Sequence, residues 1–193
     1  RNFINTNLLL ELEEQLATGD GTAPDLKGIY TTATAFDSAS YTGYKTKYAG
    51  LYDLILTMAT EIEKNTKYNC DYVLINPADA LQLTLEKDQD GNRINLPLLM
   101  GGEMKVKNVK VIETPFIAAN TLVIGDFTKA RRYFGDNITI EFGYNASGDF
   151  AKRILTLVGN MEQLLLVRNC ETDAFLKSTD IATDLTNISA TVA

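Results

Sequence analysis

A strand, a stop and a helix follow one another in residues 71–91, and this order constrains the fold more than any other stretch. The run Tyr72 to Ile75 is short, apolar and rich in β-formers, so it predicts a strand buried on both faces. Asn76 suits a helix N-cap and Pro77 suits the first helical position, so together they end the strand. A helix of about three turns is predicted next, closed by the turn residues 88–91. Its predicted apolar face consists of Ala78, Ala80, Leu81, Leu83 and Leu85.

Length and composition limit the class of protein. The chain has 193 residues, enough for one domain or two small ones, and it is 45% apolar and 22% charged, as globular proteins are. No apolar run approaches the roughly 18 residues of a membrane-spanning helix, and no secretory signal opens the chain. The sequence begins at Arg1, already inside a helical pattern, so we expect a natural N-terminal part to be missing.

The charge and the residue types disfavour several kinds of chemistry. A net charge of −7 opposes sequence-independent binding to phosphate backbones. The absence of histidine removes the commonest general base and the commonest transition-metal ligand. Cys70 and Cys170 lie 100 positions apart without a local pairing motif, which favours two reduced thiols over a disulfide or a zinc site.

Apolar spacing predicts two long helices. Residues 2–17 place four leucines on one side, namely Leu8, Leu9, Leu12 and Leu16. Residues 45–64 carry the strongest pattern, formed by Tyr48, Leu51, Tyr52, Ile55, Met58, Ala59 and Ile62. The Gly19 to Thr22 turn after the first helix is interpreted as a helix C-cap, because it lacks the Lys and Ser/Thr of a phosphate loop.

The rest of the chain predicts strands and a polar end. Short extended segments are expected at residues 28–30, 106–113, 121–124 and 138–142, with a short helix over 129–132. Residues 151–168 have one parity of apolar side chains and predict a single long strand, bent near Gly159. Residues 174–177 are expected to pair with it as a last strand. Residues beyond Ser178 predict a loose tail.

Candidate catalytic and metal-binding patterns are weak. Asp88, Asp90 and Asn92 resemble the start of a calcium loop, but residues 97–99 are Pro-Leu-Leu where a bidentate acid is expected.

Acid–base pairs are conceivable between Asp88 and Asp90, or between Glu141 and Asp149. Neither pair is accompanied by histidine, a nucleophile motif or a phosphate loop. We therefore assign no catalytic, cofactor-binding or metal-binding residue and expect no cofactor.

Seven segments in order resemble the tailed-bacteriophage major capsid proteins of the Hong Kong 97 type. Each segment is weak alone, but their order and spacing from about Leu8 to Ser178 make the resemblance specific. They are Leu12 to Thr22, Gly28-Ile29, Tyr72 to Asp79, Leu85 to Arg93, Val109 to Pro115, Val123 to Ala130 and Phe150 to Leu157.

The resemblance implies an α+β Hong Kong 97-type capsid fold, with an axial domain and a peripheral domain that contains a spine helix and long β-strands. Residues 1–44 would hold the C-terminal part of the spine helix and its connection. Residues 45–132 would form the axial core, residues 133–178 the return strands, and residues 179–193 a flexible tail. The family's N-terminal arm and extended loop would precede the spine helix.

The same resemblance implies a structural protein and no enzyme. The subunit would assemble with itself into pentamers and hexamers of an icosahedral phage or prophage head that encloses DNA without sequence-specific binding. Scaffolding, portal and maturation-protease proteins would be partners, and no membrane would be. The protein would be made in the host cytoplasm and reside in the virion. Arg153 occupies the acceptor position of the isopeptide crosslink found in some members, and Arg cannot accept it.

Two alternatives stay open. An encapsulin-type compartment shares the fold but carries cargo enzymes in place of DNA. The second alternative is an enzyme of unknown class, and the only sequence feature in its favour is the two acidic pairs named above.

Overall fold

The computed structural model describes residues 2–45, 47, 49–87, 104–135, 138–144 and 149–190. The helices are α1 (Asn2–Thr18), α2 (Ile29–Thr32), α3 (Leu51–Thr66), α4 (Pro77–Leu85), α6 (Asp149–Lys152) and α7 (Ile181–Ile188), with 3-10 turns η1 (Phe127–Lys129) and η2 (Asn169–Ala174). The strands are β1 (Thr34–Ala35), β2 (Tyr72–Ile75), β3 (Lys105–Val106), β4 (Val109–Glu113), β5 (Leu122–Gly125), β6 (Arg131–Phe134), β7 (Thr139–Gly143), β8 (Thr156–Asn160), β9 (Gln163–Leu166) and β10 (Phe175–Ser178).

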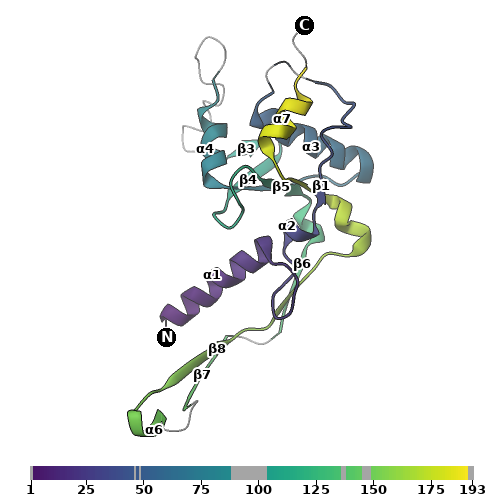
Figure 1. Cartoon of the computed structure of the whole chain (residues 1–193). Coiled ribbons are helices and arrows are strands. Elements are labelled where there is room, and N and C mark those ends of the chain that lie inside the picture. Colours follow the sequence, from purple (N-terminus) through teal and green to yellow (C-terminus); the bar gives the residue numbers. More distant parts are fainter. Residues whose placement is uncertain are drawn as a thin grey trace.

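Two parts of different build make up the molecule (Figure 1). We call the first the body: a six-stranded sheet in the order β1-β10-β5-β2-β4-β3, with α2, α3, α4 and α7 packed around it. We call the second the limb: α1, the ribbon β6–β9, and the ribbon β7–β8 with α6 at its end. The limb extends from the body as an elongated element.

The unit β2–α4 lies at the centre of the sheet, as its sequence predicts. β2 pairs with β4 in parallel and with β5 in antiparallel orientation. The Asn76 Oδ1 accepts the Ala78 N–H at 3.0 Å, and the Asn76 Nδ2 donates to the Ile117 carbonyl at 2.7 Å. The N-cap and the Pro at the first helical position are therefore confirmed.

Burial in this unit is narrower than the sequence predicts. Along β2, Val73 and Ile75 are fully buried, whereas Tyr72 and Leu74 on the other face are half-buried, so the strand is covered on both faces as expected but less completely on one. On α4, Leu83 is fully buried but Leu81 is 57% exposed and Leu85 is 43% exposed. The predicted broad apolar face was wrong, because one helix side meets the core and the other has no cover from the described body.

Helix α3 begins six residues later than its pattern predicts. Gly50 is extended (φ −98°, ψ 175°), and its N–H is accepted by the Asp53 Oδ2 at 3.1 Å, which caps the helix. Leu51 and Ile55 are then buried as predicted, and Tyr52 is only half-buried. Tyr48 lies outside the described residues.

The sheet has a core on each face. The larger core lies between the sheet and helices α3, α4 and α7, and it includes Leu51, Leu54, Ile55, Met58, Ile62, Val73, Ile75, Leu83, Val106, Val111, Leu122, Ile124, Ile181 and Ile188. The smaller core lies on the opposite face and comprises Ile29, Ala33, Ile117, Val123, Ala174 and Phe175.

The predicted flexible tail is wrong for residues 181–188, which form α7. Asp180 caps this helix, since its Oδ1 accepts the Thr183 N–H at 3.3 Å. Ile181 and Ile188 enter the larger core, because an i, i+7 pair of apolar residues lies on one helix side. The Asn187 Nδ2 donates to the Ser38 Oγ at 2.9 Å, which joins α7 to the segment after β1.

Three shorter predictions also need correction. Residues 28–30 form the start of α2 and not a strand. Residues 106–113 form two strands, because Lys107 adopts φ 58° and turns β3 back onto β4. Residues 129–132 do not form a helix: η1 ends at Lys129, and β6 begins at Arg131.

The predicted long strand, residues 151–168, consists of α6, β8 and β9. The chain changes partner after Asn160, since β8 pairs with β7 and β9 pairs with β6. The predicted break near Gly159 therefore separates two ribbons and is more than a bend. Residues 174–177 do not pair with this segment, because β10 lies in the body sheet between β1 and β5.

Candidate functional site: the surfaces of the limb

The side of the ribbons that faces α1 is set by residue parity. Odd-numbered residues from Leu157 to Val167 point toward α1 and the body: Gly159 touches α1, and Leu165 and Val167 pack on the smaller core. A Cβ at Gly159 would lie 2.9 Å from the Leu8 Cδ1 and 3.0 Å from the Ile4 Cγ2. The helix therefore rests directly on the ribbon backbone at this point.

The opposite side of the ribbon β6–β9 is uncovered. Even-numbered residues of β9 point there, and the register places Tyr133 opposite Leu164 and Arg131 opposite Leu166. Tyr133, Leu164 and Leu166 are exposed, and Arg168 is exposed just beyond them. We call this surface the ribbon outer face and define it as Arg131, Tyr133, Leu164, Leu166 and Arg168.

Helix α1 also has apolar residues on two sides. Leu12 is buried and Leu8 and Leu16 are half-buried toward the ribbon, whereas Phe3 and Leu10 are 76% and 48% exposed. The spacing of seven residues puts Phe3 and Leu10 on one side of the helix, and Glu13 and Glu14 fall on the same side. We call Phe3, Leu10, Glu13 and Glu14 the α1 outer face. Leu9, predicted for the buried side, is exposed.

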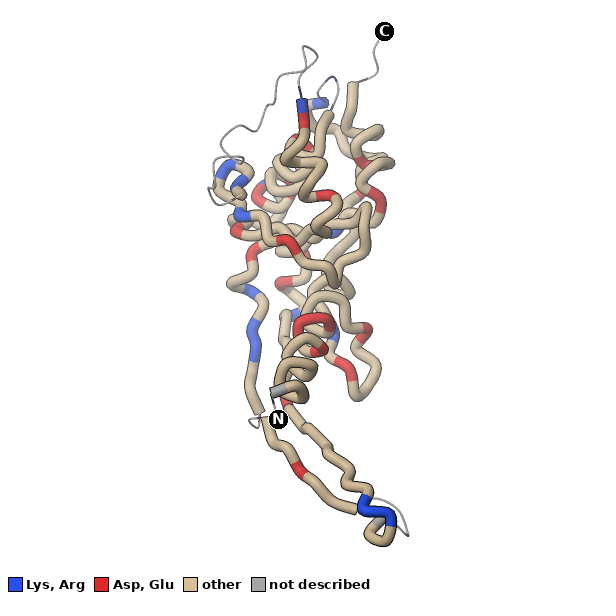
Figure 2. Tube along the Cα trace, turned by 90° about the vertical axis from the view of Figure 1, so that its left-hand side faces the viewer, with Lys and Arg blue, Asp and Glu red and all other residues tan. Residues whose placement is uncertain are grey.

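The far end of the limb is apolar and basic. Tyr144 and Phe150 meet edge to face with ring centroids 5.4 Å apart, and Phe150 is 76% exposed. Lys152 and Arg153 follow at this end (Figure 2), and Arg153 adopts φ 55°. An open pocket of about 440 Å³ lies between this ribbon and α1, lined by Ile4, Asn5, Ile138, Ile140, Phe142 and Leu157.

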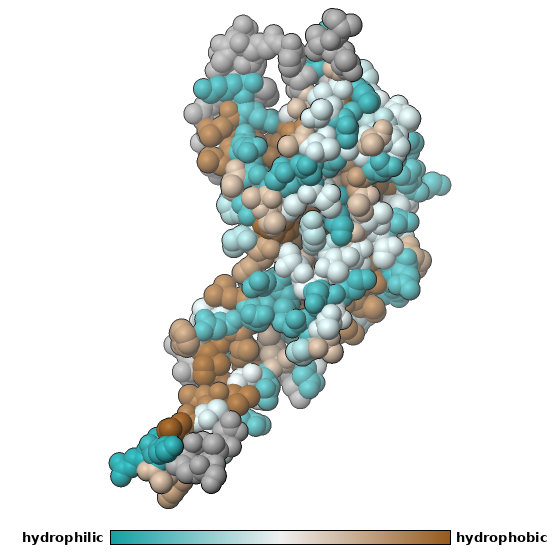
Figure 3. Space-filling view, viewed as in Figure 1, coloured by the Kyte–Doolittle hydropathy of each residue, from teal (hydrophilic) through white to brown (hydrophobic). Residues whose placement is uncertain are grey.

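The space-filling view shows patches of apolar surface along the limb (Figure 3). Within the described residues the limb holds most of the large exposed apolar side chains of the protein. They are Phe3, Leu9, Leu10, Tyr133, Phe134, Phe142, Tyr144, Phe150, Ile154, Leu155, Leu157, Val158, Leu164 and Leu166. Exposed apolar patches of this extent mark surfaces that other proteins cover.

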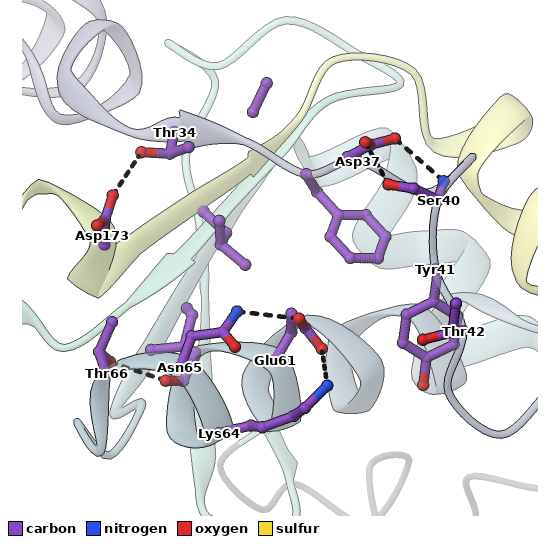
Figure 4. A pocket seen from close by; sticks show the side chains of 14 residues that line it. Thr34, Asp37, Ser40, Tyr41, Thr42, Glu61, Lys64, Asn65, Thr66 and Asp173 are labelled. Atoms are coloured by element: carbon purple, nitrogen blue, oxygen red, sulfur yellow. Dashed lines mark hydrogen bonds and ion pairs between the residues drawn. The ribbon is translucent and has the colours of Figure 1, made fainter.

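Body residues form a polar pocket of about 320 Å³ between β1 and the C-terminal half of α3 (Figure 4). Its polar groups bond to one another: the Ser40 Oγ donates to Asp37, the Thr34 Oγ1 to the Asp173 Oδ1 at 3.3 Å, and the Asn65 Nδ2 to the Glu61 Oε1 at 2.9 Å. The Asp37–Ser40 contact is a local one, three residues apart, and its hydrogen bonds lower the pKa of Asp37, which makes this carboxylate a poor general base for the Ser40 hydroxyl.

Titratable groups with shifted pKa values lie in the body, where each has a structural partner. Burial raises the pKa of Glu86, although its carboxylate accepts the Leu51 N–H at 2.7 Å and so caps α3. Burial likewise raises the pKa of Asp71, which accepts the Phe127 N–H at 2.8 Å, and the pKa of the Cys70 thiol to about 12. A thiol of that pKa stays protonated and unreactive at neutral pH.

The residues singled out from the sequence do not come together. Asp88, Asp90 and Asn92 lie outside the described residues, and so does the side chain of Asp149 that was paired with Glu141. Among the described residues, no group of three or more Cys, Asp or Glu side chains is arranged to hold a metal ion. In the same residues, no helix is both long and apolar enough to cross a membrane.

Residues 2–162 match the family model described as the phage capsid family. The chain belongs to the phage capsid family. It is 27% identical over 188 residues to the major capsid protein of Enterobacteria phage HK97, and the alignment covers 93% of this chain and 46% of that protein. The chain thus spans about half the length of that relative.

Solved structures confirm the predicted α+β fold of the Hong Kong 97 type. The capsid of the empty GTA particle is similar with a TM-score of 0.67 at 16% identity, over 92% of this chain and 63% of that one. The SrpI encapsulin of Synechococcus elongatus is similar with a TM-score of 0.57 at 13% identity, over 93% and 64%. At such identities the likeness concerns the fold alone.

Sequence reasoning did not find the surfaces that matter most. The β9 part of the ribbon outer face was hidden in a segment predicted as one long strand, and Phe3 and Leu10 of α1 were not assigned to either side of the helix. A signal was present for α1: its leucines occupy adjacent positions 8, 9 and 10, which one helix side cannot hold.

Proposed function

We propose that this chain is part of the major capsid subunit of a phage or prophage, a structural protein that packs with copies of itself into an icosahedral shell around DNA. The limb carries the proposal, because it is one helix and one ribbon thick (Figure 1) and exposes large apolar side chains on both outer sides. The family match supplies the kind of assembly.

In this proposal the body serves as the axial domain around the five- and six-fold axes, and the limb as the peripheral domain. Helix α1 would be the C-terminal part of the spine helix. The boundaries proposed from the sequence change in two places, since β10 and α7 pack into the body core.

A thin limb suits a shell for energetic reasons. A stable specific contact buries roughly 1,200 to 2,000 Å². One helix and one ribbon cannot bury that much within a single chain, but they can offer it on two sides to neighbours. Many modest contacts then act together in a closed assembly.

We further propose that the subunit acts without catalysis or cofactor and resides in the virion. The sequence contains no histidine, and the acids of the body pocket are bonded to their own neighbours. The net charge of −7 suits an inner wall that does not hold packaged DNA fast. Scaffolding, portal and maturation-protease partners are part of the same proposal.

An encapsulin-type compartment is the second candidate, favoured by the fold likeness to the SrpI encapsulin. Electron microscopy of particles formed by the full gene product, with analysis of their contents, separates the two. Shells that protect DNA from nuclease support the capsid. Shells that hold a protein cargo and no DNA support the compartment, and a protein that forms no particles under any assembly condition contradicts both.

A further inference from the structure

We propose that the ribbon outer face of one copy packs against the α1 outer face of a second copy, with both limbs pointing the same way. This inference rests on the proposed function and specifies which surfaces meet. Each face has exposed apolar side chains: Tyr133, Leu164 and Leu166 on the ribbon, and Phe3 and Leu10 on the helix.

Charge complementarity identifies a second copy as the occupant. The ribbon outer face has Arg131 and Arg168 at one end, and the α1 outer face has Glu13 and Glu14 at one end. In the described part of the chain, none of these four side chains forms an ion pair with another residue of the same copy. Both charged pairs are therefore available to a neighbour, and their signs are opposite.

The position of the charges fixes the direction of packing. Glu13 and Glu14 lie in the half of α1 nearest the body, because the Thr31 Oγ1 of α2 donates to the Thr18 carbonyl at 3.4 Å at that helix end. Arg131 also lies near the body, since β6 follows η1, whose Phe127 meets Phe175 of the smaller core edge to face. Limbs laid side by side in one direction bring these opposite charges together.

Packing of like faces is disfavoured for the same reason. With the limbs pointing the same way, two α1 outer faces would oppose Glu13 and Glu14 to their own copies, and two ribbon outer faces would oppose Arg131 and Arg168 to theirs. The two faces lie on opposite sides of the limb, because the other sides of α1 and of the ribbon, with Leu12 and Gln163, line one pocket between them. Contact between unlike faces is heterologous, and a heterologous contact with a suitable rotation closes into a ring.

Glu162 is exposed two residues before Leu164, and it also borders the pocket between α1 and the ribbon. It lies at the end away from the body, where the facing half of α1 presents Phe3 and no acid. Its charge therefore does not oppose Glu13 and Glu14 in the proposed packing.

A charge swap tests the proposal. One variant carries Glu13→Lys and Glu14→Lys, and the other carries Arg131→Glu and Arg168→Glu, in the whole 193-residue chain. We expect each variant alone to associate more than about tenfold more weakly than the unaltered protein in sedimentation velocity, because like charges then meet. An equimolar mixture of the two should regain association, since every contact in an alternating ring is again between opposite charges.

Cysteine trapping gives a second readout for weak contacts. In a Cys170→Ser background, Leu10→Cys in one copy and Leu164→Cys in the other should form a disulfide between copies on oxidation. Leu9→Cys is the matched control, since Leu9 is equally exposed one residue away on a different side of α1. We expect the 10–164 product to exceed the 9–164 product and the 10–10 product.

Three results would overturn the proposal: no recovery in the mixture, no excess of the 10–164 product at the highest concentration, or a dominant 10–10 product. If intact particles still form by electron microscopy in those cases, the capsid function stands and only this contact is wrong. If the full gene product forms no particles, the proposed function fails independently.

Discussion

Replacing Leu83 and Leu81 of α4 by alanine, one at a time, tests which helix side the body core holds. The two residues are chemically identical and two positions apart, and apolar spacing treats both as core. In the structure Leu83 is fully buried in the larger core and Leu81 is 57% exposed. The pair therefore isolates burial from residue type and helix propensity.

The magnitudes follow from that burial. A fully buried Leu→Ala change removes transfer free energy and leaves a cavity, which together lower the free energy of unfolding by about 2–5 kcal/mol. Full burial of a leucine side chain is worth about 1.5–3 kcal/mol, so a residue that is 43% buried loses only about 1 kcal/mol when truncated. Leu83→Ala should therefore destabilise the protein at least twofold more than Leu81→Ala.

Urea unfolding followed by far-ultraviolet circular dichroism measures both free energies, and the slope with denaturant should stay unchanged. For a chain of this size, each kcal/mol shifts the melting temperature by about 2–4 °C, so thermal melts give a second value. Equal losses for the two variants would refute the assignment of α4 sides. A larger loss for Leu81→Ala would mean that this outer side is the one that packs on the core.

Four further changes test other parts of the structure. Ile55→Asp puts an unpaired carboxylate into the larger core and should leave no soluble folded protein, whereas native-like melting would show that the buried side of α3 is misassigned. Glu86→Gln keeps an oxygen for the Leu51 N–H but removes a carboxyl whose pKa burial raises. Because the raised pKa of Glu86 means that the folded state binds more protons, the free energy of unfolding should fall as pH rises through the titration of this carboxyl. The fall should be smaller in Glu86→Gln, and an equal dependence on pH in both proteins would contradict the role of Glu86. Asp180→Ala removes the cap of α7 and should raise hydrogen exchange selectively in residues 181–188. Uniform or unchanged exchange would count against the role of Asp180 as the cap. Gly159→Leu should lift α1 from the ribbon and raise its exchange, with Gly143→Leu as control because no atom lies within 4 Å of a Cβ there; equal effects would argue against the close contact.

Local chemistry explains why the β2–α4 unit could be predicted from sequence. Its strand residues, its N-cap and its proline act within one or two turns of chain, so Asn76 adopts the same role whatever surrounds it. The long helices followed in the same way from spacing, apart from the start of α3, where Gly50 and Asp53 set the boundary.

Tertiary contacts explain most of the errors. Residues 181–188 are a short segment in which polar residues separate the apolar ones, and the sequence alone did not show what these would contact. In the structure Ile181 and Ile188 pack in the larger core, and the Asn120 Nδ2 donates to the Asp180 Oδ1 at 2.7 Å. Residues 151–168 keep one parity throughout, and parity alone cannot show that the two halves pair with different strands. Such facts depend on residues far away in sequence.

The candidate surfaces could be predicted only in part, because exposure depends on which sides of an element the rest of the fold leaves uncovered. Adjacent leucines showed that α1 has more than one apolar side, but only the structure shows that Leu12 is buried and Leu10 is exposed. Residue spacing indicates which apolar side chains are to be buried. It does not indicate whether residues of the same chain or of another copy bury them.

The contrast between the body and the limb gives these surfaces their physical meaning. The body sheet has a core on each face, so residues of the same chain bury both of its faces and stabilise it. The limb has only one layer on each side of its inner contact, where Gly159 lets α1 lie against the ribbon backbone, and in the described residues no further layer covers its outer sides. A side chain larger than glycine there would push the helix away and lose the little burial that the limb has. The limb is therefore only two layers thick, and both of its outer sides can contact neighbouring subunits, as the proposed shell of one layer of subunits would require.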